Sequence, residues 1–140
     1  MGVPAHLSLV TLGVADLARS IAFYESLGWQ RSGGSEGEVA FFSLGGTMLG
    51  LYGVDALADD AHQAHGVAGF RGVTLAINVL SFEAVHRMFA EFVAAGATPV
   101  KPPVAVEWGG YSGYVADPDG HLWELACNPY SPEWAAPGSE

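Results

Sequence analysis

The chain has 140 residues and a formal net charge of −10, and half of its residues are hydrophobic. A chain of this length can bury the core of one domain, and its negative charge would repel phosphate backbones and anionic membranes. We therefore expect one domain, 1–140, that binds neither nucleic acid nor membrane. No basic segment precedes an apolar one at the start, so we expect a cytoplasmic protein.

The chain begins with the pattern of a strand followed by a helix. Residues 7–14 form an apolar, partly β-branched run, and Asp16 after it is suited to cap the N-terminus of a helix. Gly28 can adopt the left-handed conformation that ends a helix. The predicted helix has one apolar stripe at intervals of three and four, formed by Leu17, Ile21, Tyr24 and Leu27.

Three short strands are predicted next, at 29–32, 39–44 and 47–52. A turn of Gly, Ser and Glu residues precedes the second, and Gly45-Gly46 is a hairpin signal before the third. Residues 53–71 then form a polar connection that has room for a short helix. The first module therefore has the order β-α-β-β-β.

The second half repeats this order. A strand at 73–79 leads to Ser81, which can cap a helix that ends before Gly96. Strands are expected at 98–100, 111–115 and 121–127, with an Asp117-Pro118-Asp119-Gly120 turn before the last. The expected apolar stripe of this helix is Phe82, Val85, Phe89, Phe92 and Val93.

The repeat indicates a duplicated module. An offset of 65 residues places Leu9 on Thr74 and aligns the two helix caps. We expect module one at about 7–58, module two at about 72–128 and a tail at 129–140. An α+β sandwich without internal symmetry is the alternative.

Three segments, 9–20, 23–29 and 114–124, resemble the vicinal oxygen chelate superfamily, the glyoxalase/bleomycin resistance protein/dioxygenase group. They carry a strand, cap and helix, then Phe-Tyr-Glu-Ser-Leu-Gly, and finally Asp-Pro-Asp-Gly-His-Leu-Trp-Glu. The resemblance implies an α+β fold of two βαβββ modules in tandem, with sheets curled around a concave pocket. It also implies a homodimer, since members commonly form dimers.

The resemblance further implies a metal site that this chain does not keep. Members that use a metal place ligands on the first and last strands of each module, at positions that correspond here to Leu9, Gly50, Thr74 and Glu124. Only Glu124 is a strong donor, and a divalent cation normally takes three or more. We therefore expect no metal and no other cofactor; a divalent metal at Glu124 is the alternative.

Other histidines and the single cysteine are expected to lie at the surface or in the core, without a role in metal binding or catalysis. His6 falls on the opposite strand face from Leu9, and His86 is expected on a helix surface. His62 and His65 have a spacing that can bind zinc on a helix, but no third ligand is near, so we expect a solvated loop. Cys127 lies in an apolar run and is expected to be a buried, inert thiol.

Strand alternation predicts a pocket that is mainly apolar and aromatic. It turns Leu122 and Ala126 inward with Glu124, and Trp123 and Leu125 toward a helix. The glycine-rich segment 107–114 adds aromatic rings, unless these pack over a bulged edge strand. The expected ligand-binding residues are Met48, Tyr52, Thr74, Asn78, Trp108, Tyr111, Tyr114 and Glu124.

Three functions are compatible with this pocket. The leading hypothesis is a metal-free site that binds a small, partly aromatic molecule. The second is a lyase, isomerase or dioxygenase that uses a metal, or Glu124 as the catalytic acid or base. The third is an interaction module whose concave face is filled by its own side chains. Glu124 is accordingly a former metal ligand kept for structure, a ligand anchor or a catalytic residue.

Overall fold

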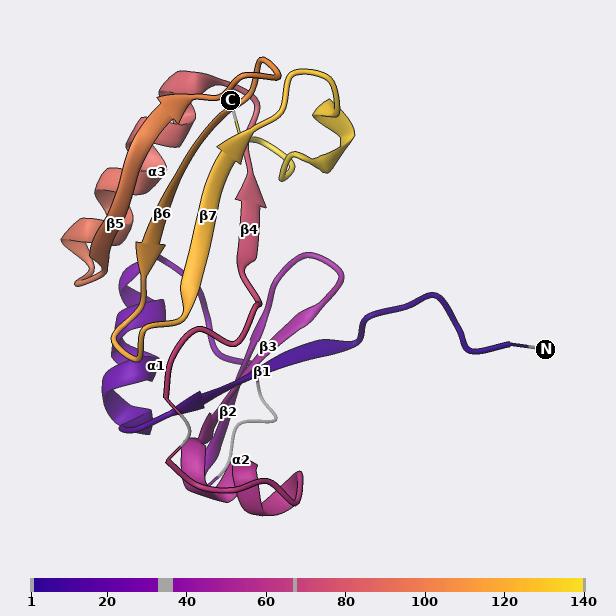
Figure 1. Cartoon of the computed structure of the whole chain (residues 1–140), viewed down its shortest axis with the longest axis vertical. Coiled ribbons are helices and arrows are strands. Elements are labelled where there is room, and N and C mark those ends of the chain that lie inside the picture. Colours follow the sequence, from indigo (N-terminus) through magenta and orange to yellow (C-terminus); the bar gives the residue numbers. More distant parts are fainter. Residues whose placement is uncertain (1, 33–36, 67, 140) are drawn as a thin grey trace. The chain divides into compact units, whose positions relative to one another are not determined.

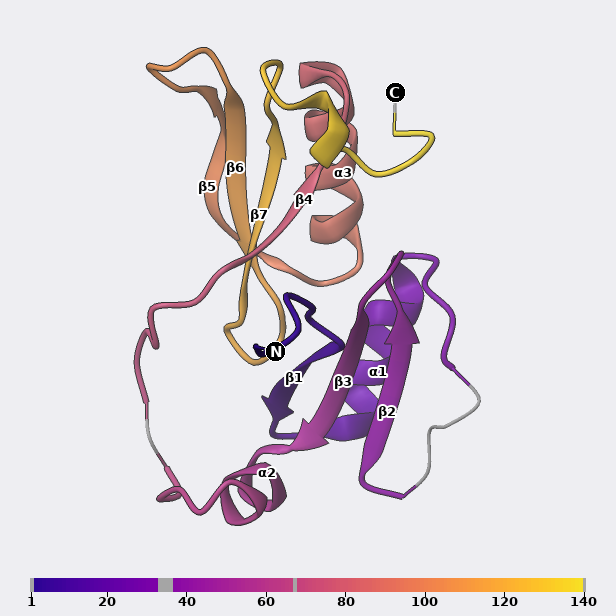
Figure 2. The same ribbon diagram turned by 90° about the vertical axis from the view of Figure 1, so that its right-hand side faces the viewer.

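The computed structural model describes residues 2–32, 37–66 and 68–139. It divides into two compact units, Met1–Ala68 (unit 1) and Gly69–Glu140 (unit 2). Each unit contains one β-sheet with a helix against one of its faces (Figures 1 and 2). The predicted α+β class is confirmed, and the order of elements is consistent with two βαβββ modules in tandem.

Unit 1 has a three-stranded sheet in the order β1-β3-β2. β1 (Leu9–Val14) runs parallel to β3 (Met48–Gly53), and β2 (Val39–Ser43) runs antiparallel to β3. α1 (Leu17–Ser26) packs on one face, where its Tyr24 meets Phe42 of β2. α2 (Val54–Asp60) follows β3 directly. It is the short helix that the sequence allowed within the connection 53–71.

One strand predicted in unit 1 is wrong. Residues 29–32 contribute only an isolated bridge between Arg31 and Phe42. The reason lies in Trp29, whose ring stacks on that of Tyr24 with 5.5 Å between centroids, so this segment is bound to the helix. The turn predicted before β2 falls largely on 33–36, outside the described residues.

Unit 2 has the predicted order of elements, β4 (Leu75–Asn78), α3 (Phe82–Ala94), β5 (Thr98–Ala105), β6 (Tyr111–Ala116) and β7 (Leu122–Cys127). Its sheet has the order β4-β7-β6-β5, in which only β4 and β7 are parallel. α3 covers one face, and its Phe92 lies 6.1 Å, centroid to centroid, from the buried ring of Trp123. Burial of Trp123 toward the helix confirms the alternation predicted for β7.

Local signals set the ends of the two main helices as expected. The Asp16 carboxylate accepts a hydrogen bond from the Arg19 backbone N–H, and the Ser81 hydroxyl oxygen accepts one from that of Ala84. Gly28 and Gly96, just beyond the C-terminal caps, have φ angles of 88° and 113°. These angles favour glycine, which explains why both helices end there.

The chain ends in unit 2 with a tail that covers part of the outer edge of β4. After the 3-10 helix η1 (Pro132–Trp134), the Ala136 N–H donates to the Asn78 carbonyl and the Leu80 N–H donates to the Ser139 carbonyl. These bonds satisfy outward backbone groups at one sheet edge. Within the described ranges, no helix has the length and apolar character needed to cross a membrane.

Candidate functional site

The face of the unit 2 sheet opposite α3, its open face, carries the most polar part of the candidate site. Strand register places Tyr114 of β6 directly beside Glu124 of β7, and Ala76 of β4 beside Glu124 on the other side. Asn78 lies one step along β4, beside Ala126. Directly paired residues point to the same face of a sheet, so Tyr114, Glu124 and Asn78 share this face as predicted.

Tyr114 and Glu124 form a hydrogen-bonded pair. Burial raises the pKa of the Tyr114 phenol above its ordinary 10.0, and the charge of Glu124 and the hydrogen bond between them raise it further. The phenol therefore stays protonated at neutral pH and donates to the carboxylate. Because an ionised carboxylate accepts about four hydrogen bonds, Glu124 keeps acceptor capacity for a ligand.

Tyr111 lies on the other face of this sheet. Its ring stacks on Phe82 of α3 with 4.6 Å between centroids, and its hydroxyl lies 2.6 Å from Nε2 of His86. Tyr111 and Tyr114 are three residues apart on one strand, and an odd separation puts them on opposite faces. The glycine-rich segment was expected to supply at least one ligand-facing aromatic residue, and of the two tyrosines on β6 only Tyr114 faces away from α3.

Trp108 and Thr74 lie beside the sheet, outside its regular strands. Trp108 is 55% exposed, and its ring lies over Gly110, where an added Cβ would come within 2.1 Å of it. Gly109 is similarly approached by the Tyr130 hydroxyl. Thr74 is exposed and comes just before β4. The ligand-binding roles predicted for both residues remain predictions.

Unit 1 also has an open face, opposite α1, and it is mainly apolar. Met48, Gly50 and Tyr52 alternate on β3 and share this face as predicted, with Leu9 beside Met48. A Cβ built on Gly50 would lie 3.2 Å from Phe41 Cε1, 3.2 Å from Thr11 Oγ1 and 3.5 Å from Leu9 Cδ1. Phe41 and Thr11, which the sequence prediction missed, therefore surround Gly50.

Most of the chain matches the model of a known protein family. Residues 6–125 match the model of the Glyoxalase/Bleomycin resistance protein/Dioxygenase superfamily. The chain belongs to this superfamily. No curated protein matches the chain.

Solved structures of the superfamily agree with this assignment. A glyoxalase-related enzyme from Fulvimarina pelagi has 37% identity and a TM-score of 0.80 over 90% of both chains. A family enzyme from Burkholderia phytofirmans PsJN has 24% identity and a TM-score of 0.79, over 88% of this chain and 98% of that one. A lactoylglutathione lyase from Agrobacterium tumefaciens shares the fold, with 22% identity and a TM-score of 0.69 over 91% and 96%.

The residues at the superfamily's metal positions do not fit a metal in this chain. In unit 1, Leu9 and Gly50 lie close together, as the two ligands of that half would, and neither side chain has a donor atom. In unit 2, Glu124 is engaged by Tyr114 and has Ala76 as its neighbour on β4. Among the described residues, no three His, Cys, Asp or Glu side chains are grouped to hold a metal ion.

Proposed function

We propose that this superfamily member binds a small, partly aromatic molecule without a metal, at the open faces of its sheets. The observation that carries the proposal is the Tyr114–Glu124 pair, since a carboxylate at a position that corresponds to a metal ligand is instead held by a phenol. We also propose a cytoplasmic homodimer, in keeping with the chain's acidic charge and its open sheet edges.

The side chains specify the chemistry of the ligand. Because Tyr114 already donates to Glu124, the free positions on this carboxylate are acceptors, and the ligand should present an N–H or O–H group there. The ring of Tyr114 beside this carboxylate favours a flat ligand ring, and Phe41, Met48 and Tyr52 give the open face of unit 1, considered by itself, the same preference. An aromatic amine, amide or phenol therefore fits better than a simple anion.

The second candidate function is metal-free acid/base catalysis at Glu124. The same pair favours it, because two titratable groups in contact can divide the roles of proton donor and acceptor. A ligand that is released chemically unchanged would support binding alone. Conversion of a ligand by the wild type that Glu124→Gln abolishes would support the enzyme.

Calorimetric titration of purified protein with a panel of aromatic amines, amides and phenols tests the proposal. For a compound that binds at the unit 2 face, we expect Glu124→Gln and Tyr114→Phe each to weaken binding by roughly 0.5–3 kcal/mol for a lost hydrogen bond. For a compound that binds at the unit 1 face, we expect the same of Tyr52→Phe. Tyr130→Phe is the matched control, since Tyr130 is exposed and lies by the β5–β6 loop. Equal binding by all four variants would refute the site.

Elemental analysis of the same protein tests the absence of a metal. We expect no stoichiometric zinc, iron, manganese or nickel, because three of the four positions, Leu9, Gly50 and Thr74, lack a strong donor. One equivalent of metal that disappears in Glu124→Ala would overturn the metal-free proposal and favour a metal-dependent enzyme.

A further inference from the structure

α2 in unit 1 is a helix with little stabilisation of its own. It has seven residues, its N-cap is Gly53 without a side-chain hydrogen bond, and its last turn holds no basic residue. Asp59 and Asp60 lie at its C-terminal end, where the helix dipole disfavours negative charge. Helices this short are marginal in water, so α2 depends on contacts from outside the helix.

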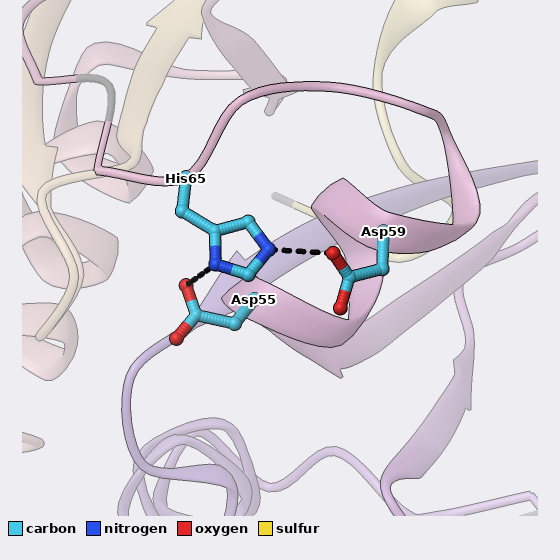
Figure 3. A network of polar contacts seen from close by, with 3 residues as sticks. All are labelled: Asp55, Asp59 and His65. Atoms are coloured by element: carbon cyan, nitrogen blue, oxygen red, sulfur yellow. Dashed lines mark hydrogen bonds and ion pairs between the residues drawn. The ribbon is translucent and has the colours of Figure 1, made fainter.

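His65 supplies such a contact from the segment that follows. Its Nε2 lies 2.6 Å from Asp59 Oδ1, and its Nδ1 lies 3.6 Å from Asp55 Oδ1 (Figure 3). Asp55 and Asp59 are four residues apart, so they lie on the same side of α2 and face the ring from both edges. We call His65, Asp55 and Asp59 the histidine clamp.

The clamp is complete only when His65 is charged. Neutral imidazole can keep the 2.6 Å hydrogen bond to Asp59 but has no charge to attract Asp55 at 3.6 Å, whereas imidazolium donates to Asp59 and forms an ion pair with both carboxylates. We propose that protonation of His65 holds α2 and the segment 61–65 together, and that deprotonation releases the segment and frays the C-terminal end of the helix.

The charges that act on His65 give the direction of the pH dependence. Asp59, through its hydrogen bond and its charge, and then Asp55 raise the pKa of His65 above its ordinary 6.5. A raised pKa means that the stabilisation is complete below the unfolded value and is lost as pH rises through the folded value. The clamp is therefore closed in mildly acidic solution and opens in alkaline solution.

Release of the clamp would change the surroundings of the open face of unit 1. Val54, the first residue of α2, lies against Gly13 of β1, where an added Cβ would be 2.9 Å from Val54 Cγ2. Gly13 pairs with Tyr52 across the sheet, so α2 borders the end of the face that carries Tyr52. Regulation of ligand access by His65 rests on the proposed function, whereas the clamp itself does not.

NMR of the full chain tests the clamp without a ligand. From about pH 5 to about pH 9, we would follow the His65 ring signals, the Cα secondary shifts of 54–63 and the Tyr52 ring signals. We expect the helical shifts near 57–63 to fall, and the Tyr52 signals to move, with the midpoint of His65. That midpoint should lie above the ordinary value of 6.5.

Variants separate the clamp from general effects of pH. His65→Gln should show the frayed helix at every pH, and His65→Lys, which keeps a cation, should retain the helix in alkaline solution. Asp59→Asn should lower the midpoint of His65 more than Asp60→Asn does, and His62→Gln should behave as the wild type. Helical shifts that stay constant with pH, or a transition that persists in His65→Gln, would overturn the inference.

Discussion

Gly13 and Gly110 each lie under a side chain from another position, but those side chains differ in freedom to move. At Gly13 an added Cβ would meet Val54 Cγ2 at 2.9 Å and the Val54 Cα at 3.3 Å. At Gly110 it would meet the ring of Trp108, which is more than half exposed. A ring at the surface can swing away, whereas the backbone of α2 cannot move without disturbing its packing on β1.

Gly13→Ala should therefore destabilise the protein by about 1–3 kcal/mol, the usual result of overpacking. Gly110→Ala should lose less than about 1 kcal/mol, because the exposed Trp108 ring can adopt another rotamer. Urea unfolding of the two variants and the wild type gives both differences. Equal losses would contradict the distinction between a fixed and a movable neighbour.

At the scale of the element, α1 and α3 begin at side chains that replace missing backbone partners. Asp16 and Ser81 each accept a hydrogen bond from the backbone N–H three residues ahead, at 3.1 Å and 3.0 Å. The first N–H groups of a helix otherwise lack an internal acceptor. The caps also fix where each helix leaves the preceding strand.

Replacement of either cap should weaken the fold by a measurable amount. We expect Asp16→Ala and Ser81→Ala each to lower the free energy of unfolding by about 0.5–2 kcal/mol. Ser26→Ala is the control, because the Ser26 hydroxyl donates to the Ala22 carbonyl inside α1 and caps nothing; its effect should stay within about 0.5 kcal/mol. Thermal unfolding followed by circular dichroism measures all three, and a Ser26→Ala loss as large as the cap losses would argue against capping.

Elements whose signals are local could be predicted from the sequence. Caps, C-terminal glycines and alternation placed α1, α3 and the strands of unit 2, and they put Trp123 on the helix side of β7. The strand predicted at 29–32 is reduced to an isolated bridge because Trp29 stacks on Tyr24. Such a contact between elements has no local signal in the sequence. His65 reaching back to α2 is likewise a tertiary contact, which periodicity does not reveal.

The candidate site was predictable to the same extent. Period-two alternation placed Glu124 and Asn78 on one face of the unit 2 sheet and Met48 and Tyr52 on one face of the unit 1 sheet. The same alternation along β6 separates Tyr111 from Tyr114, which the aromatic and glycine-rich pattern of 107–114 does not reveal. The bond between Tyr114 and Glu124 depends on strand register, which one sequence does not determine.

At the scale of the whole molecule, the outer edges of the two sheets differ in how they are protected. β5, at the edge of the unit 2 sheet, contains three prolines and Lys101 and has two register shifts against β6, features that discourage pairing with another strand. β1 is at the edge of the unit 1 sheet, and its sequence, LVTLGV, has no proline and no charge. Leu9 on this edge is 42% exposed.

We therefore predict that a second copy of the chain covers the β1 side of unit 1 in a homodimer. Because each chain carries a net charge of −10, screening should strengthen the association, so the dimer fraction in sedimentation should rise with salt. Leu9→Lys should shift the protein toward monomer. Val100→Lys is the matched control, since it adds the same charge to an exposed residue of β5. A wild type that stays monomeric at high salt, or two variants that dimerise equally well, would exclude this interface.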